Sequence, residues 1–436
     1  MGASEYDFAE AEKLTREELD ALQLERLQWT LHQAAKAPFY QQRFEALGGV
    51  PQVTSLEGLR KLPVTTKDDL RAGMPWGFLA VPRREAVRMH YSSGTTGVAT
   101  AVYHTAGDVR RWAECVARGM LAAGVSADDV FQNMMTYGLF TGGLGFHYAA
   151  ELIGCLTIPV GGGNTARQVH IMHTFGTTCL HILPSYALRV ALFCQEQGLD
   201  PRDDLAVRVL FIGGEPHTEN SRRRIESQFA GKAYNCYGLS ELCGPGVAME
   251  CEEQTGLHLR EDHYIAEILD PDTLEPVPEG EYGELVVTTL TREAMPLIRY
   301  RTRDITRFLP GECACGRAHR RIDRIRGRSD DMLIVRGCNV YPMQVERILM
   351  GYTELGSNWL ITLDRVRGMD RMTVTVELSP DYGVDEARQL EALRERIQHD
   401  LRTELLLTPE VELAEPGKLP VSEGKAQRVI DKRQEE

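Results

Sequence analysis

The chain has little positive charge relative to its acids. It carries 49 Lys and Arg against 63 Asp and Glu, which gives a formal net charge of −14. Proteins that bind nucleic acid by neutralising phosphates, or membranes through a polybasic strip, need the opposite balance. The composition therefore predicts neither a nucleic-acid nor a membrane partner.

Long hydrophobic runs are also missing. No stretch approaches the roughly 18 apolar residues that a spanning helix requires, and residues 1–20 are too acidic for a signal peptide. The ten cysteines are scattered, and several lie in apolar surroundings, as free thiols do in a reducing cytosol. We therefore expect a soluble, cytoplasmic protein.

At 436 residues the chain is too long for one compact core, which implies at least two domains. Apolar spacing predicts a helix over residues 9–37, and cap and stop signals predict another over residues 64–73. Residues 107–210 alternate helical patterns with short apolar runs, which is typical of parallel βα units. After residue 262 the strands become amphipathic and turn-separated. The predicted fold class is α/β, with an antiparallel β subdomain added.

One segment, YSSGTTGVATAVYHT over residues 91–105, concentrates glycine and hydroxyl side chains. Backbone N–H groups of such a loop can converge on an anion, and the hydroxyls can reach phosphate oxygens or a metal. The Walker spacing and its lysine are absent, and a flexible loop is the plainer alternative for this run alone. The candidate phosphate-binding residues are Ser92, Ser93, Gly94, Thr95, Thr96 and Gly97.

Five further motifs follow: GGEP, NCYGLSELCG, IRYRTRD, GRSDDMLIVRG and SEGKAQRV, which begin at residues 213, 235, 298, 327 and 422. The second sets Tyr237 four residues before Glu241. An aromatic face can stack on a purine, and a carboxylate beside a phosphate loop can hold a divalent cation. Asp304 ends the third motif, where it can accept a hydrogen bond from a ribose diol.

With these motifs in this order, the chain resembles the adenylate-forming superfamily of acyl-CoA ligases, and most closely the phenylacetate–CoA ligase family. The resemblance runs from about residue 40 to the C-terminus. It implies a large N-terminal ATP- and acyl-binding domain (1–329) and a small, mobile α+β lid (330–436), hinged at Asp330. A solvated turn is the plainer reading of the hinge motif taken alone.

The resemblance also implies the reaction. A carboxylate attacks the α-phosphorus of ATP, pyrophosphate leaves, and the thiolate of coenzyme A displaces AMP from the acyl-adenylate. Lys425, in a Ser-Glu-Gly-Lys turn of the lid, is the expected catalytic lysine, because its ammonium would bridge the carboxylate and the α-phosphate. Thr95 and Glu241 are expected to hold Mg²⁺, and Asp304 the ribose, with Arg328 reaching the ribose or a phosphate.

Further nucleotide and coenzyme A contacts come from the same resemblance. For Tyr237 a core aromatic is the plainer alternative to stacking on adenine. The residues expected around the nucleotide are Gly214, Glu215, Pro216, Asn235, Tyr237, Gly238 and Ile325, and those expected along the pantetheine tunnel are Arg336, Gly337 and Tyr341.

Residues 134–154 resemble the family segment that lines the acyl site. Phe146 is larger than the residue expected in a phenylacetate enzyme, so we expect it to shorten or tilt the pocket, which leaves benzoate-like and heteroaromatic acids open. Residues 134–153 contain no Lys or Arg to pair with a second acidic group. The predicted substrate contacts are Tyr137, Phe140, Gly142, Phe146, Gly213 and Pro245.

A separate constellation suits a metal. Cys313 and Cys315 form a C-x-C turn, and two thiolates in a Gly-rich turn suit a tetrahedral soft-ligand metal such as Zn²⁺. Cys251 and His258 are the expected remaining ligands, with His263 and His319 as alternatives to His258. Four unrelated side chains in surface loops are the plainer reading. A metal here is expected to be structural, because these residues lie apart from the catalytic motifs.

Three functions are compatible with these motifs. The first is an ATP-dependent aryl-acid–CoA ligase, with the acid, ATP and coenzyme A as its partners. The second is a stand-alone adenylating enzyme that loads a carrier protein, which presents the same pantetheine thiol. The third is a ligand-binding relative without catalysis, which the intact motif residues disfavour. A homodimer stays open.

Overall fold

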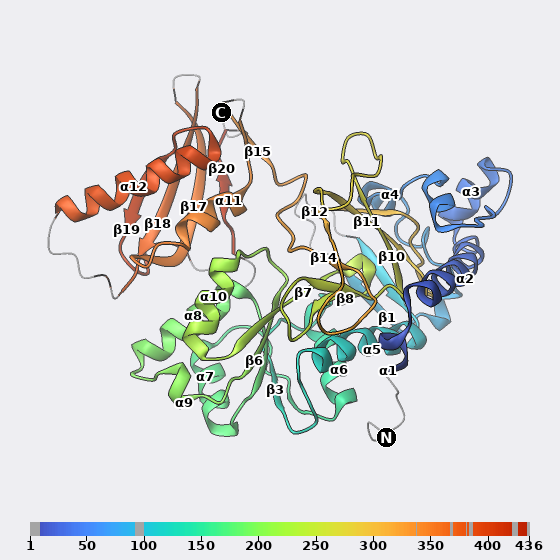
Figure 1. The fold of residues 1–436 in the computed structure, drawn as a ribbon, viewed down its shortest axis with the longest axis horizontal. Helices are drawn as coiled ribbons and strands as arrows, with labels where there is room; N and C mark the ends of the chain where they lie inside the picture. The colour runs from blue at the N-terminus through green and yellow to red at the C-terminus, as the bar shows by residue number, and fades with distance from the viewer. Residues whose placement is uncertain are drawn as a thin grey trace.

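A nine-stranded sheet runs through the large domain of the computed structural model, which describes residues 9–91, 100–336, 338–366, 369–380, 382, 387–420 and 426–433 (Figure 1). The strands lie in the order β13-β14-β9-β8-β7-β6-β5-β3-β4. The parallel part consists of β3 (Val130–Asn133), β4 (Leu156–Ile158), β5 (Cys179–Ile182), β6 (Val209–Gly213) and β7 (Lys232–Leu239). The antiparallel part consists of β8 (Gly244–Glu250), β9 (Leu257–Leu259), β13 (Phe308–Leu309) and β14 (Arg321–Ile322).

Helices connect the parallel strands and supply two apolar clusters. One cluster joins α5 and α6 to the sheet around Phe131 and Phe211, and the other joins α7, α8 and α10 to it around Leu180 and Leu210. Each helix therefore buries one face against the strands, as in other parallel sheets. The helices are α5 (Ala106–Ala122), α6 (Gly142–Ile153), α7 (Thr165–Phe175), α8 (Pro184–Glu196), the short α9 (Pro201–Asp204) and α10 (Glu219–Phe229).

A three-stranded antiparallel sheet packs with the N-terminal helices at the other side of the large domain (Figure 1). It contains β10 (Tyr264–Leu269), β11 (Gly283–Thr289) and β12 (Tyr300–Thr306). The hairpin of β1 (Arg88–Tyr91) and β2 (Ala101–His104) flanks the predicted phosphate loop. The helices and 3₁₀ turns here are α1 (Ala9–Lys13), α2 (Arg16–Ala34), α3 (Pro38–Ala46), η2 (Leu56–Lys61), α4 (Lys67–Ala72) and η3 (Arg83–Glu85).

The C-terminal lid has its own core, built on a four-stranded sheet in the order β19-β18-β17-β20. Figure 1 shows the lid above α8 and α10, with α11 on the side that faces α10. Its elements are β15 (Leu333–Val335), β16 (Cys338–Val340), α11 (Pro342–Leu349), β17 (Leu355–Val366), β18 (Met369–Leu378), α12 (Ala387–Leu405), β19 (Glu410–Ala414) and β20 (Val429–Asp431).

The predicted fold class is confirmed, but the single helix over residues 9–37 is wrong. It divides into α1 and α2 because Thr15 caps α2: its hydroxyl accepts from the N–H of Glu18, whose carboxylate accepts from the N–H of Thr15. The cap signal over residues 64–73 is confirmed in α4, where Thr66 forms the same box with Asp69. Strand β11 is buried along its whole length instead of amphipathic, since it is the central strand of its sheet.

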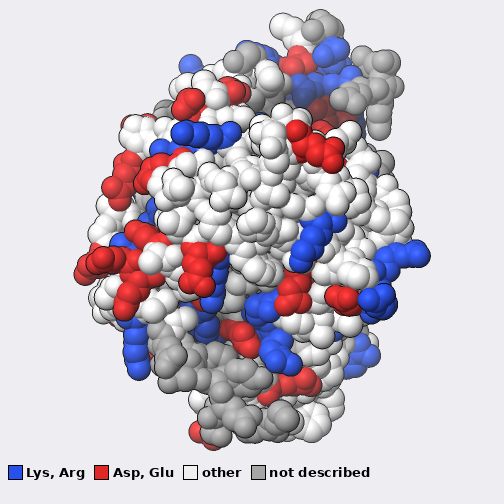
Figure 2. Space-filling view, turned by 90° about the vertical axis from the view of Figure 1, so that its right-hand side faces the viewer, with Lys and Arg blue, Asp and Glu red and all other residues white. Residues whose placement is uncertain are grey.

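The distribution of charged side chains can be followed on one face of the molecule. On the face in Figure 2, acidic and basic side chains are interspersed around a large area of uncharged residues. Among the described residues, no helix is both long and apolar enough to cross a membrane.

A buried ionic network ties α1 to the large domain through Glu12. Its carboxylate accepts hydrogen bonds from Arg118 Nε at 2.7 Å, Arg317 Nε at 2.7 Å and Arg260 Nη1 at 3.3 Å. Burial opposes ionisation of Glu12, but Arg260 and Arg118 outweigh it and lower its pKa to about 2. A lowered carboxyl pKa stabilises the fold above the unfolded-state value and loses that contribution as the pH falls.

We expect Glu12→Gln to lower the melting temperature at pH 7, because it removes the charge that three arginines surround. A pKa change from 4.5 to about 2 corresponds to about 3 kcal/mol at most. The difference between variant and parent should shrink as the pH falls from about 4.5 towards 2. Glu25→Gln, an exposed change on α2, is the matched control. Equal melting temperatures for the Glu12 variant and the parent across this range would contradict the assignment.

Candidate active site

The motifs of the large domain meet at the carboxyl ends of its parallel strands. The GGEP turn follows β6, the 3₁₀ turn η4 (Ser240–Leu242) follows β7, and residues 134–141 follow β3. All parallel strands end at one edge of a sheet, and open α/β sheets bind ligands there. Eight predicted residues lie outside the described part of the chain: Ser92, Ser93, Gly94, Thr95, Thr96, Gly97, Gly337 and Lys425.

Glu241 is buried on η4 and lies beside the end of the predicted phosphate loop. Its Oε1 is 3.4 Å from Lys67 Nζ, and it accepts a hydrogen bond from Thr100 Oγ1 at 3.5 Å. Sequence reasoning missed Lys67, although the capping signal at Thr66 puts it at the first position of α4. An ammonium and a carboxylate thus meet where the β1–β2 hairpin presents its loop, an arrangement that suits a polyphosphate with a cation.

Tyr237 and Asp304 form the second polar group of the site. The Tyr237 hydroxyl donates to Asp304 Oδ2 at 2.6 Å, and Arg328 Nη1 lies 3.8 Å from Asp304 Oδ1. Burial raises the pKa of Asp304 to about 6, against the opposing effects of Tyr237 and Arg328. Both side chains are almost fully buried. Stacking of Tyr237 on a base stays a prediction, while its hydroxyl is held by Asp304.

Arg328 links this pair to the predicted hinge. Its guanidinium donates to both carboxylate oxygens of Asp330, at 2.8 Å and 3.0 Å. The backbone of Ser329 still bonds to Arg303 of β12, and the first lid strand begins at Leu333. The chain therefore leaves the large domain within these few residues. The hinge at Asp330 and the domain division stay predictions.

The GGEP turn requires glycine at its first two positions, and it contacts the lid. A Cβ on Gly213 would lie 2.3 Å from the carbonyl oxygen of Cys236, and Gly214 has a φ of +79°, so both positions need glycine. The Glu215 carboxylate accepts from Ser185 N at 2.7 Å and from Ala426 N at 3.2 Å. Ala426 directly follows the predicted catalytic lysine, so the lid meets the large domain at this turn.

The other predicted nucleotide and coenzyme contacts are spread around this turn and the lid. Asn235 is buried on β7, and a Cβ on Gly238 would lie 1.8 Å from the Gly244 carbonyl oxygen. On the lid side, the side chain of Arg336 donates to the Asp370 carbonyl at 2.6 Å. Ile325 and Tyr341 are half-buried, and Pro216 is exposed.

The acyl segment corrects one prediction. Phe146 has no exposed surface and stacks on His181 with ring centroids 3.8 Å apart, inside the cluster that contains Phe131 and Phe211. It is therefore a core residue beneath the segment, because α6 turns this face onto the sheet, and it does not form a wall of the pocket. The reason for doubting phenylacetate as the acid falls with it.

The other predicted acyl contacts differ in their exposure. The hydroxyl of Tyr137 accepts from Asn133 Nδ2 at 2.9 Å, and the side chain is half-buried. Phe140 is 45% exposed, and Gly142 begins α6. The Pro245 carbonyl accepts from Trp112 Nε1 at 2.8 Å, which ties the start of β8 to α5.

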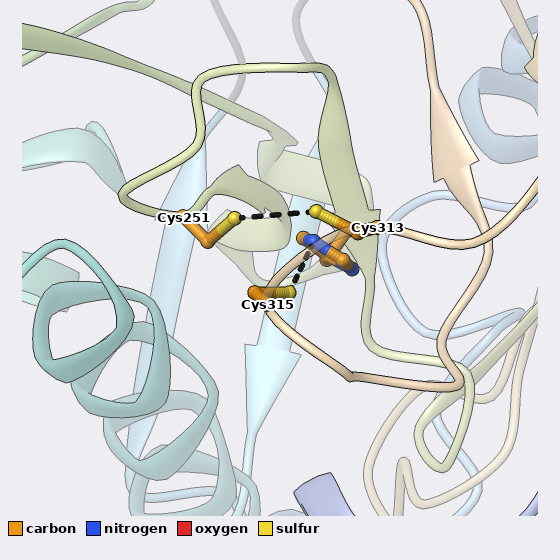
Figure 3. A group of neighbouring side chains, drawn as sticks. Cys251, Cys313 and Cys315 are labelled. Atoms are coloured by element: carbon orange, nitrogen blue, oxygen red, sulfur yellow. Dashed lines mark hydrogen bonds between the residues drawn. The ribbon is translucent and has the colours of Figure 1, made fainter.

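The predicted metal ligands do come together, at the antiparallel end of the nine-stranded sheet (Figure 3). Their ligand atoms all lie within 4.8 Å of one another. Cys251 Sγ is 3.8 Å from Cys313 Sγ, and Cys315 Sγ is 3.4 Å from His258 Nε2. His258 Nδ1 lies 3.2 Å from the carbonyl oxygen of His319. A donated Nδ1–H leaves the Nε2 lone pair aimed at the three sulfurs, as metal-binding histidines require.

Two family models match the chain: "AMP-binding enzyme" over residues 40–291 and "AMP-binding enzyme C-terminal domain" over residues 337–433. The phenylacetate–coenzyme A ligase of Aromatoleum evansii is 44% identical over 435 residues, covering 99% of this chain and 98% of that protein. The crystal structure of 2-hydroxyisobutyryl-CoA ligase in its postadenylation state has a TM-score of 0.92, 30% identity and coverage of 99% and 96%. The thioesterification state of that ligase, at 31% identity and the same coverage, has a TM-score of 0.72.

We expect Asp304→Asn to raise the melting temperature at pH 7.5. Folding raises the pKa of this carboxyl from 3.8 to about 6. The protonated carboxyl therefore contributes to the free energy of unfolding below about pH 4, and this contribution is lost as the pH rises through about 6. The amide removes this loss, which amounts to about 3 kcal/mol at most. The gain should vanish towards pH 4. Asp323→Asn is the control. The Asp323 carboxylate also accepts a hydrogen bond from a tyrosine, Tyr282, at 2.6 Å, but it is more exposed, so this variant should give no gain in melting temperature. A destabilised Asp304 variant at pH 7.5 would contradict the prediction.

Proposed function

The chain belongs to the phenylacetate–CoA ligase family of AMP-binding enzymes, and we propose that the acid it activates is phenylacetate or a close arylacetic relative. It activates its acid with ATP through an acyl-adenylate and passes the acyl group to coenzyme A. The relative named above matches along nearly its whole length, which supports free coenzyme A as the acceptor.

The structural observation that supports the adenylation step is the contact between Ala426 and Glu215. It brings the segment that follows Lys425 to the edge of the sheet where Glu241 and Asp304 are buried. An adenylating enzyme needs this convergence, because the attacking carboxylate, the α-phosphate and a cation must meet in a site from which water is excluded.

In the first half-reaction, a carboxylate oxygen attacks the α-phosphorus and the bond to the β-phosphate oxygen breaks, so that pyrophosphate carries away the electron pair. Lys425 is assigned to the negative charge shared by the carboxylate and the α-phosphate. Asp304 is assigned to the ribose diol, held in place by Tyr237 and Arg328. Lys67 is assigned to the outer phosphates, since its ammonium already lies beside Glu241.

Glu241 and Thr95 are the residues that would hold Mg²⁺, which neutralises phosphate charge when bound. The buried carboxylate of Glu241 fits this role, because a cation, the Lys67 ammonium, lies 3.4 Å from it. In the second half-reaction the thiolate attacks the acyl carbon and AMP leaves. Arg336, Gly337 and Tyr341 are assigned to the pantetheine arm, and the lid has to turn about Asp330 to present them.

The Cys251–His258–Cys313–Cys315 cluster is assigned to a structural Zn²⁺. In a tetrahedral site with Zn–S bonds of about 2.3 Å, neighbouring sulfurs lie about 3.8 Å apart. The Cys251–Cys313 distance of 3.8 Å matches this edge, and the Cys315–His258 distance of 3.4 Å suits a sulfur and a nitrogen ligand. The loop that carries Cys313 and Cys315 also carries Arg317, which donates a hydrogen bond to Glu12. The metal would therefore support the attachment of α1.

We expect pyrophosphate release that depends on phenylacetate, and thioester formation only when coenzyme A is added. Removal of one methylene from a bound acid costs about ten- to a hundredfold in kcat/KM, so benzoate should be the poorer substrate by that factor. A panel of aromatic acids, assayed with and without coenzyme A, measures both. Benzoate at or above phenylacetate would overturn the substrate assignment.

Lys425→Ala serves as the control for the chemistry within the same assay. Loss of a charge-assisted contact in a dry site lowers the adenylation rate by about two to three decades. Thioester formation from supplied phenylacetyl-adenylate should persist, because the lysine acts only in the first transition state. Pyrophosphate release within a few-fold of the parent would remove Lys425 from the mechanism.

For the metal, elemental analysis of untagged protein should give about one zinc per chain. The Cys313→Ser/Cys315→Ser variant should lose the zinc and melt at a lower temperature, while its adenylation rate at low temperature falls only mildly. Cys338→Ser, at a half-buried cysteine on the lid, is the matched control and should keep the zinc. Protein without zinc, indifferent to the double substitution, would refute the site. Zinc present with adenylation abolished in the still-folded variant would refute only its structural role.

A further inference from the structure

The lid rests on the first turns of α10 through a small set of polar contacts. Glu346 of α11 accepts from Ser221 Oγ at 2.6 Å and from Thr218 N at 3.1 Å. Beside them, Asn220 Nδ2 donates to the Arg347 carbonyl at 3.2 Å and Arg224 Nη2 to the Leu355 carbonyl at 2.8 Å. One face of α10 therefore serves as a docking surface, which we call the α10 face: Thr218, Asn220, Ser221 and Arg224.

The buried carboxylate of Glu346 needs the hydrogen bonds of the α10 face. It is only 7% exposed, and burial raises the pKa of its carboxyl. Arg428 favours the charged form of Glu346, but its guanidinium lies over the Trp359 ring and donates to the Trp359 and Ser357 carbonyls. A buried carboxylate without its donors costs several kcal/mol, while the positive end of a helix stabilises it. The hydrogen bonds from α10 are thus the main compensation for burying this charge.

The same lid position serves the first half-reaction. The backbone N–H of Ala426 reaches Glu215 in the same lid position that rests on the α10 face, and Ala426 directly follows Lys425. The chain matches the postadenylation state of 2-hydroxyisobutyryl-CoA ligase with a TM-score of 0.92 and the thioesterification state of the same ligase with 0.72, at equal coverage. The arrangement described here is therefore closer to the postadenylation state than to the thioesterification state.

We propose that Glu346 is a positioning residue that holds the lid in its adenylation orientation by binding the N-terminal turn of α10, and that this contact breaks when the lid turns for thioester formation. The proposal rests on the proposed two-step function. A lid that must move can release such a contact, because the hydroxyl and N–H donors of the large domain can exchange Glu346 for water.

A double-mutant cycle of Ser221→Ala and Glu346→Gln tests the contact in each half-reaction separately. A hydrogen bond to a charged group shifts an equilibrium by about tenfold or more. We expect the ratio of the adenylation rate to the rate of thioester formation from supplied adenylate to fall by about that factor in each single variant. The double variant should fall little further, because both changes act on one charge-assisted hydrogen bond: Ser221→Ala removes its donor and Glu346→Gln removes its charge. Glu391→Gln, the same charge change on exposed α12, should leave the ratio unchanged.

Hydrogen exchange gives a readout that needs no activity. In the ligand-free protein, peptides that contain Thr218 should exchange faster in the Glu346→Gln variant than in the parent or the Glu391→Gln control. Equal losses in both half-reactions, additive single effects or unchanged exchange of the Thr218 peptide would overturn the proposal. A parent enzyme without acid-dependent pyrophosphate release would instead refute the proposed function, and the exchange measurement would then decide the contact alone.

Discussion

The common carboxyl edge of the parallel strands is the constraint on which the rest of this structure depends. Parallel strands all end at the same side of a sheet, so the segments after β3, β6 and β7 converge although they lie far apart in sequence. Glycines at 213 and 238 allow the turns there to approach neighbouring backbone closely. The lid meets the large domain at this edge too, through the contact of Ala426 with Glu215.

The two ends of the nine-stranded sheet serve different purposes. Its parallel end lies beside the groups assigned to chemistry: Tyr237 of β7 binds Asp304 of the neighbouring three-stranded sheet, whose pKa burial raises to about 6. Its antiparallel end carries the Cys/His cluster and, beside it, the arginines around Glu12, where charges are paired and stabilising. The raised pKa of Asp304 marks a group that is costly to ionise in the folded protein, while the lowered pKa of Glu12 marks one whose charge stabilises it.

Much of the site was predictable because local signals carried it. The Gly/Ser/Thr run, the Tyr237–Glu241 spacing and the turns at 213 and 327 are short motifs whose chemistry depends on near neighbours. The four metal ligands could be named for a similar reason, since thiols in a C-x-C turn have few other uses. Phe146 was wrong, because spacing alone does not say which face of α6 turns to the sheet. Lys67 was missed, because its partner Glu241 lies in a different part of the chain.

The sequence by itself determined the family, the α/β class, the acidic charge balance and the motifs that name the candidate side chains, because composition and ordered motifs are properties of the chain. Only the tertiary structure decided which of these side chains meet. Tyr237 pairs with Asp304, and Glu346 binds α10, through contacts between residues that are 67 and 125 positions apart. The orientation of the lid depends on contacts of the same kind. Such contacts follow from how helices and strands pack, and no local pattern records them.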